Sequence, residues 1–253
     1  MKTNFTYLTL LICSICIATF FLLPAIPQDL TYHQFADQRM ILTIPHFWNV
    51  ITNLPFLLVG VTGLILIHQH TNPALIISIK SVYLWFFGGV CLVCLGSSYY
   101  HLSPDNSTLL WDRLPMTIAF MSFFCVVIAE FLSEVAAKKL FIPLILTGLL
   151  SVFYWYYTEL YSNGDLRFYA LIQFLPMLFI PVILLRHKTP FTHSSYYWLI
   201  LFMYVLAKLL EFYDKAIFDL LGFISGHSLK HVASAFGPYF FYLTLKKRKF
   251  KII

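Results

Sequence analysis

Charged side chains are scarce in this sequence. Only 11% of the 253 residues are Asp, Glu, Lys or Arg, whereas 60% are apolar and the mean hydropathy is +0.78. A soluble domain of this size carries about 25% charged residues to cover its surface. The shortage therefore excludes an ordinary soluble globular protein and indicates that much of the surface faces lipid.

Eight stretches contain no charged residue at all. Most of them approach or reach the roughly 20 residues with which a helix crosses a bilayer. Backbone groups in hydrocarbon need internal hydrogen bonds, and continuous apolar runs differ from the alternating pattern of barrel strands. The sequence therefore predicts a single all-α domain, a polytopic membrane helix bundle with eight spans. The stretches cover residues 5–26, 48–67, 81–100, 114–129, 140–158, 168–185, 195–207 and 232–245.

The first stretch has two interpretations. Lys2 could begin a signal peptide, but the apolar run from Asn4 to Ile26 exceeds the usual core of roughly 7–15 residues. The segment "PAIPQ" also lacks the small residues of a cleavage site. We favour a retained transmembrane helix within residues 1–30, an uncleaved signal anchor, and cleavage remains the alternative.

Basic residues are distributed unevenly between the two ends of the predicted spans. Alternating the spans from the basic tail places eleven Lys and Arg residues on one side and four on the other, and an excess of this kind marks the cytoplasmic side. Both termini are therefore predicted to be cytoplasmic, and the net charge of +6 does not indicate nucleic acid. The larger group is Lys2, Lys80, Lys138, Lys139, Arg186, Lys188, Lys246, Lys247, Arg248, Lys249 and Lys251.

Five polar residues fall at the opposite, extracytoplasmic ends of three spans. Ser97 and His101 are four residues apart, so they share one helix face, and Asp112 begins the next span. His227 and His231 are again four apart and open the last span. An odd number of missed spans would have placed His227 and His231 on the opposite side of the membrane from Ser97 and His101. Because all five residues fall at the same depth, we predict that they form a common site.

The residue types in this group are typical of a catalytic zinc site. Three histidines, His101, His227 and His231, leave one zinc position open, whereas structural zinc sites are usually closed by four protein ligands. Asp112 would serve as a supporting or general-base carboxylate, and the Ser97 hydroxyl would donate to a ligand or to a developing oxyanion. Ionisable groups at membrane depth are expensive, which favours function over chance.

Other polar residues have plainer interpretations. Asp105 lies in the turn 103–107 and is expected to belong to a connector. Glu211 and Asp214 are expected to form an ion-pair network at a helix end, with support of the site as the alternative. Asn49 and Asn53 share a face, and hydrogen bonds between helices account for them.

The combined motifs resemble those of a known family. SxxxH ending one helix, the Asp of "WDRLPM" eleven residues later and the late HxxxH are similar to the alkaline ceramidases. That family belongs to a seven-helix membrane hydrolase superfamily that includes the adiponectin-receptor-like proteins. "FWNVITNLPFLLVG" resembles the first core helix of the family. The resemblance covers about residues 32–245, and the first span is additional to the seven core helices of the family. We therefore expect an N-terminal transmembrane helix within residues 1–30, a seven-helix hydrolase domain at 31–246 and a basic cytoplasmic tail at 247–253.

The resemblance also implies an activity. His101, His227 and His231 would bind Zn²⁺, Asp112 would take a proton from the attacking water and pass it to the leaving amine, and Ser97 would stabilise the oxyanion. The substrate would be the amide of ceramide or a related N-acyl lipid, cut to a long-chain base and a free fatty acid. No nucleic-acid partner is expected, and protein partners are left open.

Calcium is the point at which the sequence departs from the animal enzymes. They carry an acidic calcium-binding segment before the first core helix, with a Glu two residues before the Trp of "FWN". Here that position is His46, and only Asp29 and Asp37 precede it. We therefore carry no calcium site over, and Ca²⁺ stays open.

Two other functions compete with the amidase. A receptor or sensor of the same superfamily would keep the metal and hydrolyse weakly. A transporter would need polar residues running through to the inner side, and the third, fourth and eighth spans look apolar below their outer ends. Composition and the lack of long tails favour a bacterial inner membrane, with the site on its extracytoplasmic side.

Overall fold

The computed structural model describes residues 14–15, 18, 20–69 and 72–252. In this part of the chain the secondary structure is helical, apart from two isolated β-bridges. The elements are η1 (Leu30–His33), α2 (Phe47–Ile51), α3 (Leu54–Gln69), η2 (Ile77–Ile79), α4 (Lys80–Leu102), α5 (Asn106–Phe131), α6 (Glu134–Tyr161), α7 (Arg167–Arg186), α8 (Tyr196–Phe212), α9 (Asp214–Leu221) and α10 (Gly226–Lys247).

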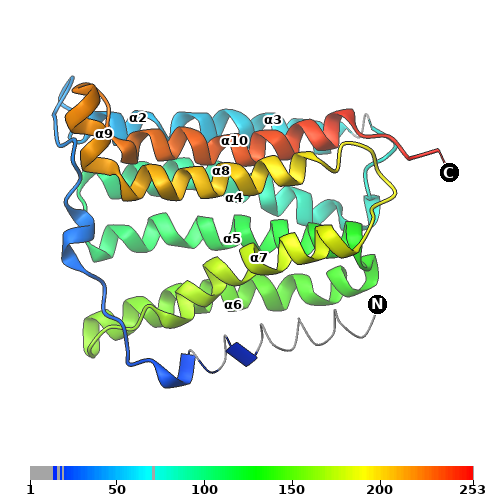
Figure 1. Ribbon diagram of the computed structural model, residues 1–253, viewed down its shortest axis with the longest axis horizontal. Coiled ribbons are helices and arrows are strands. Elements are labelled where there is room, and N and C mark those ends of the chain that lie inside the picture. Colours follow the sequence, from blue (N-terminus) through cyan, green and yellow to red (C-terminus); the bar gives the residue numbers. More distant parts are fainter. Residues whose placement is uncertain (1–13, 16–17, 19, 70–71, 253) are drawn as a thin grey trace.

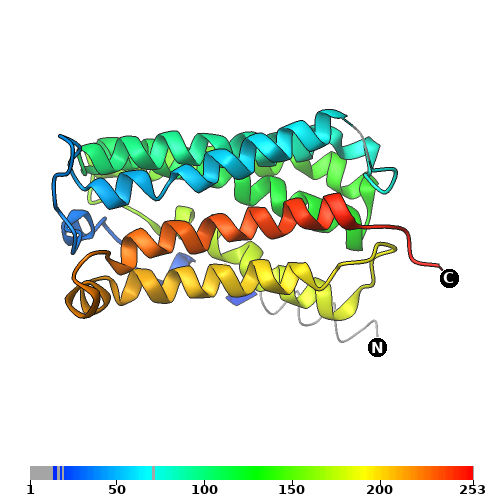
Figure 2. The same cartoon turned by 90° about the horizontal axis from the view of Figure 1, so that it is seen from above.

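The long helices run side by side along one axis and form a bundle (Figures 1 and 2). Within the described residues, five helices are long and apolar enough to cross a membrane, and α8 with α9, bent by 75°, would make a sixth span. An all-α membrane bundle is therefore confirmed. The count of eight spans stays a prediction, and most of the N-terminal helix expected within residues 1–30 lies outside the described residues.

The predicted second span is broken into two helices. α2 ends at Ile51 and α3 begins at Leu54, with Thr52 and Asn53 between them. Pro55 explains the break, because it lacks an N–H, its ring clashes with the carbonyl four residues earlier, and it disfavours a helical residue before it. The break leaves Thr52 with a side chain inside the bundle, 7% exposed.

The connector between α4 and α5 is a helix cap. The Asp105 carboxylate accepts from the Thr108 N–H at 2.7 Å, and the Thr108 hydroxyl completes a capping box. The expectation that Asp105 belongs to a connector is confirmed. Close packing follows at Gly96, where an added Cβ would lie 2.1 Å from the Trp111 carbonyl oxygen. Only glycine lets α4 approach α5 this closely.

Residues 24–46 cross the end of the bundle where α4 ends and α5 and α10 begin (Figure 1). The crossing segment is attached along its length: the Leu166 N–H donates to the Ile26 carbonyl at 2.8 Å, and Arg39 donates to the Phe223 carbonyl at 2.8 Å. It therefore covers the end at which the candidate site residues gather.

The opposite end contains a buried ionic cluster that sequence analysis missed. Arg248, expected in a basic tail, is 1% exposed and pairs with Glu130, 5% exposed. The Tyr197 hydroxyl donates to Glu130 at 2.7 Å, and Arg248 donates to the Tyr83 hydroxyl at 3.0 Å. The ends of these spans far from the histidines are therefore less apolar than the sequence indicated.

Candidate metal centre

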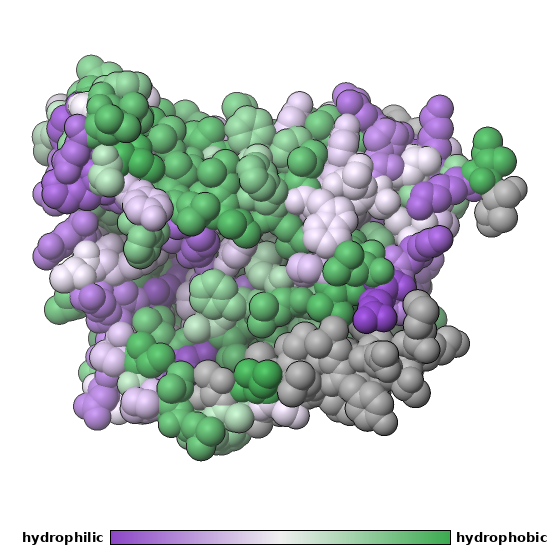
Figure 3. Space-filling model, in the orientation of Figure 1, coloured by the Kyte–Doolittle hydropathy of each residue, from purple (hydrophilic) through white to green (hydrophobic). Residues whose placement is uncertain are grey.

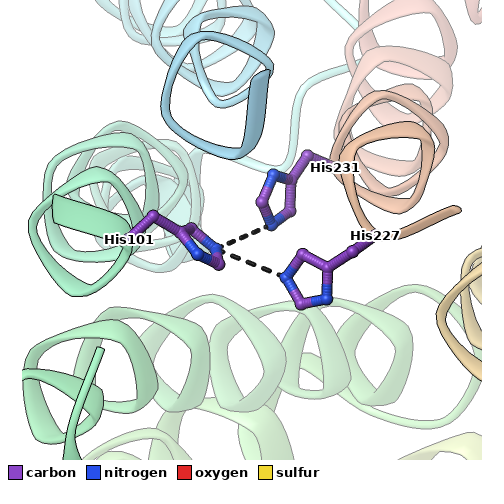
Figure 4. Close-up of side chains that lie close together, drawn as sticks. All are labelled: His101, His227 and His231. Carbon is purple, nitrogen blue, oxygen red and sulfur yellow. Dashed lines mark hydrogen bonds between the residues drawn. The ribbon is translucent and has the colours of Figure 1, made fainter. Parts of the chain in front are cut away.

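Three histidines meet at the covered end of the bundle. His101 comes from the last turn of α4, and His227 and His231 come from the first turns of α10 (Figure 4). The Nε2 of His101 lies 3.2 Å from the Nε2 of His231 and 3.4 Å from the Nε2 of His227. All three rings are buried, with exposures of 1–4%.

The spacing of these nitrogens fits a bound cation. Two nitrogens that bind zinc tetrahedrally at 2.0–2.1 Å stand about 3.3–3.4 Å apart, close to the separations of 3.2 and 3.4 Å. Candidate ligand atoms of the three residues all lie within 4.8 Å of one another. A proton can bridge two ring nitrogens, whereas a cation satisfies all three lone pairs together.

The break between α2 and α3 supplies a partner for His231. The Thr52 hydroxyl donates to the Trp48 carbonyl at 2.6 Å, so its oxygen is left to accept from the Nδ1–H of His231 at 3.0 Å. With the proton on Nδ1, the Nε2 lone pair of His231 faces the other two rings. Hydrogen bonds of this kind fix the tautomer and orientation of metal-binding histidines.

The crossing segment closes the outer side of the centre. The Phe35 ring, 4% exposed, lies 4.7 Å from the His101 ring and 4.5 Å from the His227 ring. His46 Nδ1 contacts the His101 carbonyl oxygen at 2.9 Å. These contacts separate the histidines from solvent beyond the end of the bundle.

Asp214 links this segment to α10. One carboxylate oxygen accepts from the backbone N–H of His227 at 2.7 Å, and the other accepts from the N–H of Ala36 at 2.9 Å. The first bond also places a negative charge at the positive end of the α10 dipole. Gly226 lets α10 begin this close to α8 and to Asp214, because a Cβ there would lie 2.2 Å from the Leu210 carbonyl oxygen and 2.8 Å from the Asp214 Cα. Asp214 therefore positions both Phe35 and His227.

A partly open cavity of about 280 Å³ begins beside His231 and is lined mainly by residues of α4, α5, α7, α8 and α10. Its polar end contains Ser97, Asp112 and Glu211, and its far end is apolar, with Phe86, Phe123 and Ile200. The helices α4, α5 and α8 each contribute lining residues eleven positions apart, for example Ser97 and Phe86, so the cavity extends about 16 Å along the bundle. Figure 3 shows hydrophilic side chains in a hollow below α8, with apolar surface above them and hydrophilic surface continuing toward the left end of the bundle.

The structure brings together all five residues that the motifs singled out. Ser97, 3% exposed, and the half-buried Asp112 face each other across the contact between α4 and α5. Both line the same cavity as His231. Their catalytic roles stay predictions, because proximity alone does not assign them.

Two plainer interpretations are confirmed for one residue of each pair. Lys208 and Lys230 both pair with Glu211 at 2.8 Å, which is the expected ion-pair network at a helix end, but Asp214 forms no ion pair in the described residues. The Asn49 side-chain oxygen accepts from the Ser228 hydroxyl at 2.6 Å, which is the expected bond between helices, whereas the Asn53 side chain donates to the Asn49 carbonyl four residues earlier.

The two acids considered for calcium have other partners. Asp37 binds Arg39 through both carboxylate oxygens, at 2.7 and 2.8 Å. Burial raises the pKa of Asp37, but the hydrogen bonds and charge of Arg39 outweigh it and leave that pKa below its usual range. Asp29 caps η1 by accepting from the Thr31 N–H. The question of calcium stays open.

Sequence analysis missed Thr52, Phe35 and Asp214 as parts of the centre. Pro55 announces the helix break, which would have directed attention to Thr52. No comparable signal marks Phe35, because one aromatic residue in an irregular segment has no periodicity. Asp214 was singled out only as part of an ion-pair network, whereas its bonds are to backbone N–H groups.

Comparison with known proteins assigns the chain to a family. A family model described as Ceramidase matches residues 36–250, while a comparison with curated proteins returned no match. The matched region contains the three histidines, Ser97 and Asp112, and it spans most of the chain. The chain therefore belongs to the ceramidase family.

Proposed function

We propose that the protein is a zinc-dependent integral-membrane amidase. It hydrolyses the amide bond of ceramide or a related N-acyl lipid to a long-chain base and a free fatty acid. One observation carries the proposal: three buried imidazole Nε2 atoms converge beside the polar end of a largely apolar cavity, which His231 lines. Membership of the ceramidase family supports the reaction type.

His101, His227 and His231 would hold the metal. Zn²⁺, when bound, polarises a carbonyl oxygen and lowers the pKa of water. Thr52 keeps the Nε2 of His231 available, and Phe35 limits access of bulk water from the end of the bundle. An amide at the polar end of the cavity would reach the centre with its acyl chain between α4, α5 and α8.

Asp112 and Ser97 would carry the proton and the charge. The Asp112 carboxylate accepts a proton from the attacking water, whose oxygen adds to the amide carbon. The Ser97 hydroxyl donates a hydrogen bond to the carbonyl oxygen as that oxygen gains negative charge. Asp112 then returns the proton to the amine nitrogen as the C–N bond breaks.

We place the site on the extracytoplasmic side of a bacterial inner membrane, with both termini in the cytoplasm. The excess of basic residues at the other end of the bundle supports this orientation. We retain the division into a first helix within residues 1–30, a hydrolase domain at 31–246 and a basic cytoplasmic tail at 247–253. Within that tail, Arg248 anchors the chain to Glu130.

Purified full-length protein tests the proposal. It should contain about one zinc per chain and release fatty acid from ceramide or another N-acyl lipid. His231→Ala should abolish both, and His68→Ala, an exposed histidine on α3, should change neither. Retained zinc with no turnover across a panel of N-acyl lipids would contradict the amidase and favour the receptor interpretation. Zinc flux in proteoliposomes that His101→Ala abolishes would favour a transporter.

A further inference from the structure

Arg113 is buried at the polar end of the cavity and fixed in place. It is 6% exposed, and its guanidinium lies 4.0 Å from the Trp155 ring and 4.7 Å from the Tyr169 ring. Its Nη2 donates to the Gln28 side-chain oxygen at 2.6 Å. Stacking and this bond determine where the planar donor group points.

The other end of the guanidinium is unpaired. Nη1 of Arg113 is buried and has no hydrogen-bond partner in the described part of the chain. Arg113 also takes part in none of the salt bridges found among the described residues. A buried N–H group of a charged side chain is costly when it has no hydrogen-bond acceptor, and a ligand that supplies one removes that cost. Because Arg113 lines the cavity, that ligand would enter from the cavity.

The side chains at the polar end of the cavity carry more positive than negative charge, which favours an anionic ligand. Lys208 and Lys230 share one carboxylate, that of Glu211, and Asp112 is the remaining acid among the cavity-lining residues. Three cations with Arg113 therefore face two carboxylates, and a bound metal ion adds positive charge. An anionic group on the bound lipid would compensate this excess of positive charge.

We propose that Arg113 Nη1 binds a carboxylate of the lipid in the cavity. The inference rests on the proposed amidase function and narrows its ligand class. The carboxylate has two sources, a headgroup on the amine side of the substrate, as in an N-acyl amino acid, or the fatty acid product. Both present two oxygens to a planar donor.

A matched substrate pair tests the headgroup source. N-palmitoylglycine and N-palmitoylglycinamide differ in the negative charge of the headgroup, and fatty acid release gives kcat and KM for each. The wild type should favour the anionic lipid in kcat/KM by about ten- to a hundredfold, the size of a charge-assisted hydrogen bond. Arg113→Gln should bring that ratio close to one, mainly through KM, whereas Arg113→Lys should retain part of it. Arg186→Gln, at the exposed far end of α7, is the control and should keep the wild-type ratio.

Binding tests the product source without turnover. Affinities of palmitate and palmityl alcohol for the protein in lipid nanodiscs are compared by calorimetry. Palmitate should bind the wild type about tenfold more tightly than it binds Arg113→Gln, while the alcohol should bind both alike. If Arg113 affects the binding of palmitate but not the preference between the two substrates, the fatty acid product is the source of the carboxylate. Equal charge preference in wild type and Arg113→Gln in both assays overturns the inference, even where amide hydrolysis is intact. Absence of hydrolysis with Arg113-dependent palmitate binding refutes the amidase and leaves the anion site standing.

Discussion

Removing the Thr52 hydroxyl should weaken metal binding without disturbing the fold. Thr52→Val keeps the shape of the side chain but deletes the oxygen that lies 3.0 Å from His231 Nδ1. The Nδ1–H then loses its acceptor in a buried site, and the proton is free to move to Nε2. A protonated Nε2 cannot bind a cation, so the cost falls on metal affinity.

The size of the effect follows from the lost interaction. Loss of a group that orients a metal-binding histidine costs about 10–100-fold in affinity, and one hydrogen bond alone contributes about 1 kcal/mol, or roughly fivefold. We expect zinc affinity to fall at least about tenfold. Thr52→Ser, which restores the hydroxyl, should recover most of it.

Competition with a fluorescent zinc chelator measures the affinity in detergent. Thr62→Val is the matched control: its hydroxyl donates to the Leu58 carbonyl at 2.8 Å, the same bond within a helix that Thr52 makes to Trp48, but it has no histidine partner. Thermal unfolding of the metal-free proteins should be similar for both variants. Unchanged zinc affinity in Thr52→Val would refute the assignment of the His231 tautomer.

Two further predictions concern packing and the end of the bundle far from the histidines. Gly96→Ala should force α4 away from the Trp111 carbonyl, lower the free energy of unfolding by about 1–3 kcal/mol and reduce turnover. Gly88→Ala is the control and should have none of these effects, because its Cβ would meet nothing within 4 Å. An unaffected melting temperature for Gly96→Ala would contradict the close approach of the two helices. Glu130→Gln leaves the buried Arg248 charge unpaired and should cost about 3–5 kcal/mol by thermal unfolding. The double variant Glu130→Leu, Arg248→Met should regain much of that loss, and a double variant no more stable than Glu130→Gln would count against a purely structural ion pair.

Much of the site was predictable because helices and membranes impose simple rules. Spacing of four places His227 beside His231 and Ser97 beside His101 on their helices. Alternation of spans then assigns both pairs and Asp112 to one end of the bundle. These inferences need no side-chain contacts, and the structure brings all five residues together at that end.

The sequence by itself determined the class of fold and the group of candidate residues, because apolar run length and helical period are local properties. Only the tertiary structure decided which groups complete the centre, since Thr52, Phe35 and Asp214 reach it from irregular segments or helix ends that no periodicity predicts. The same holds for Arg113, because residues from three distant segments fix its guanidinium and so leave one nitrogen unpaired. Such properties follow from contacts between residues far apart in the chain, and those form only when the bundle assembles.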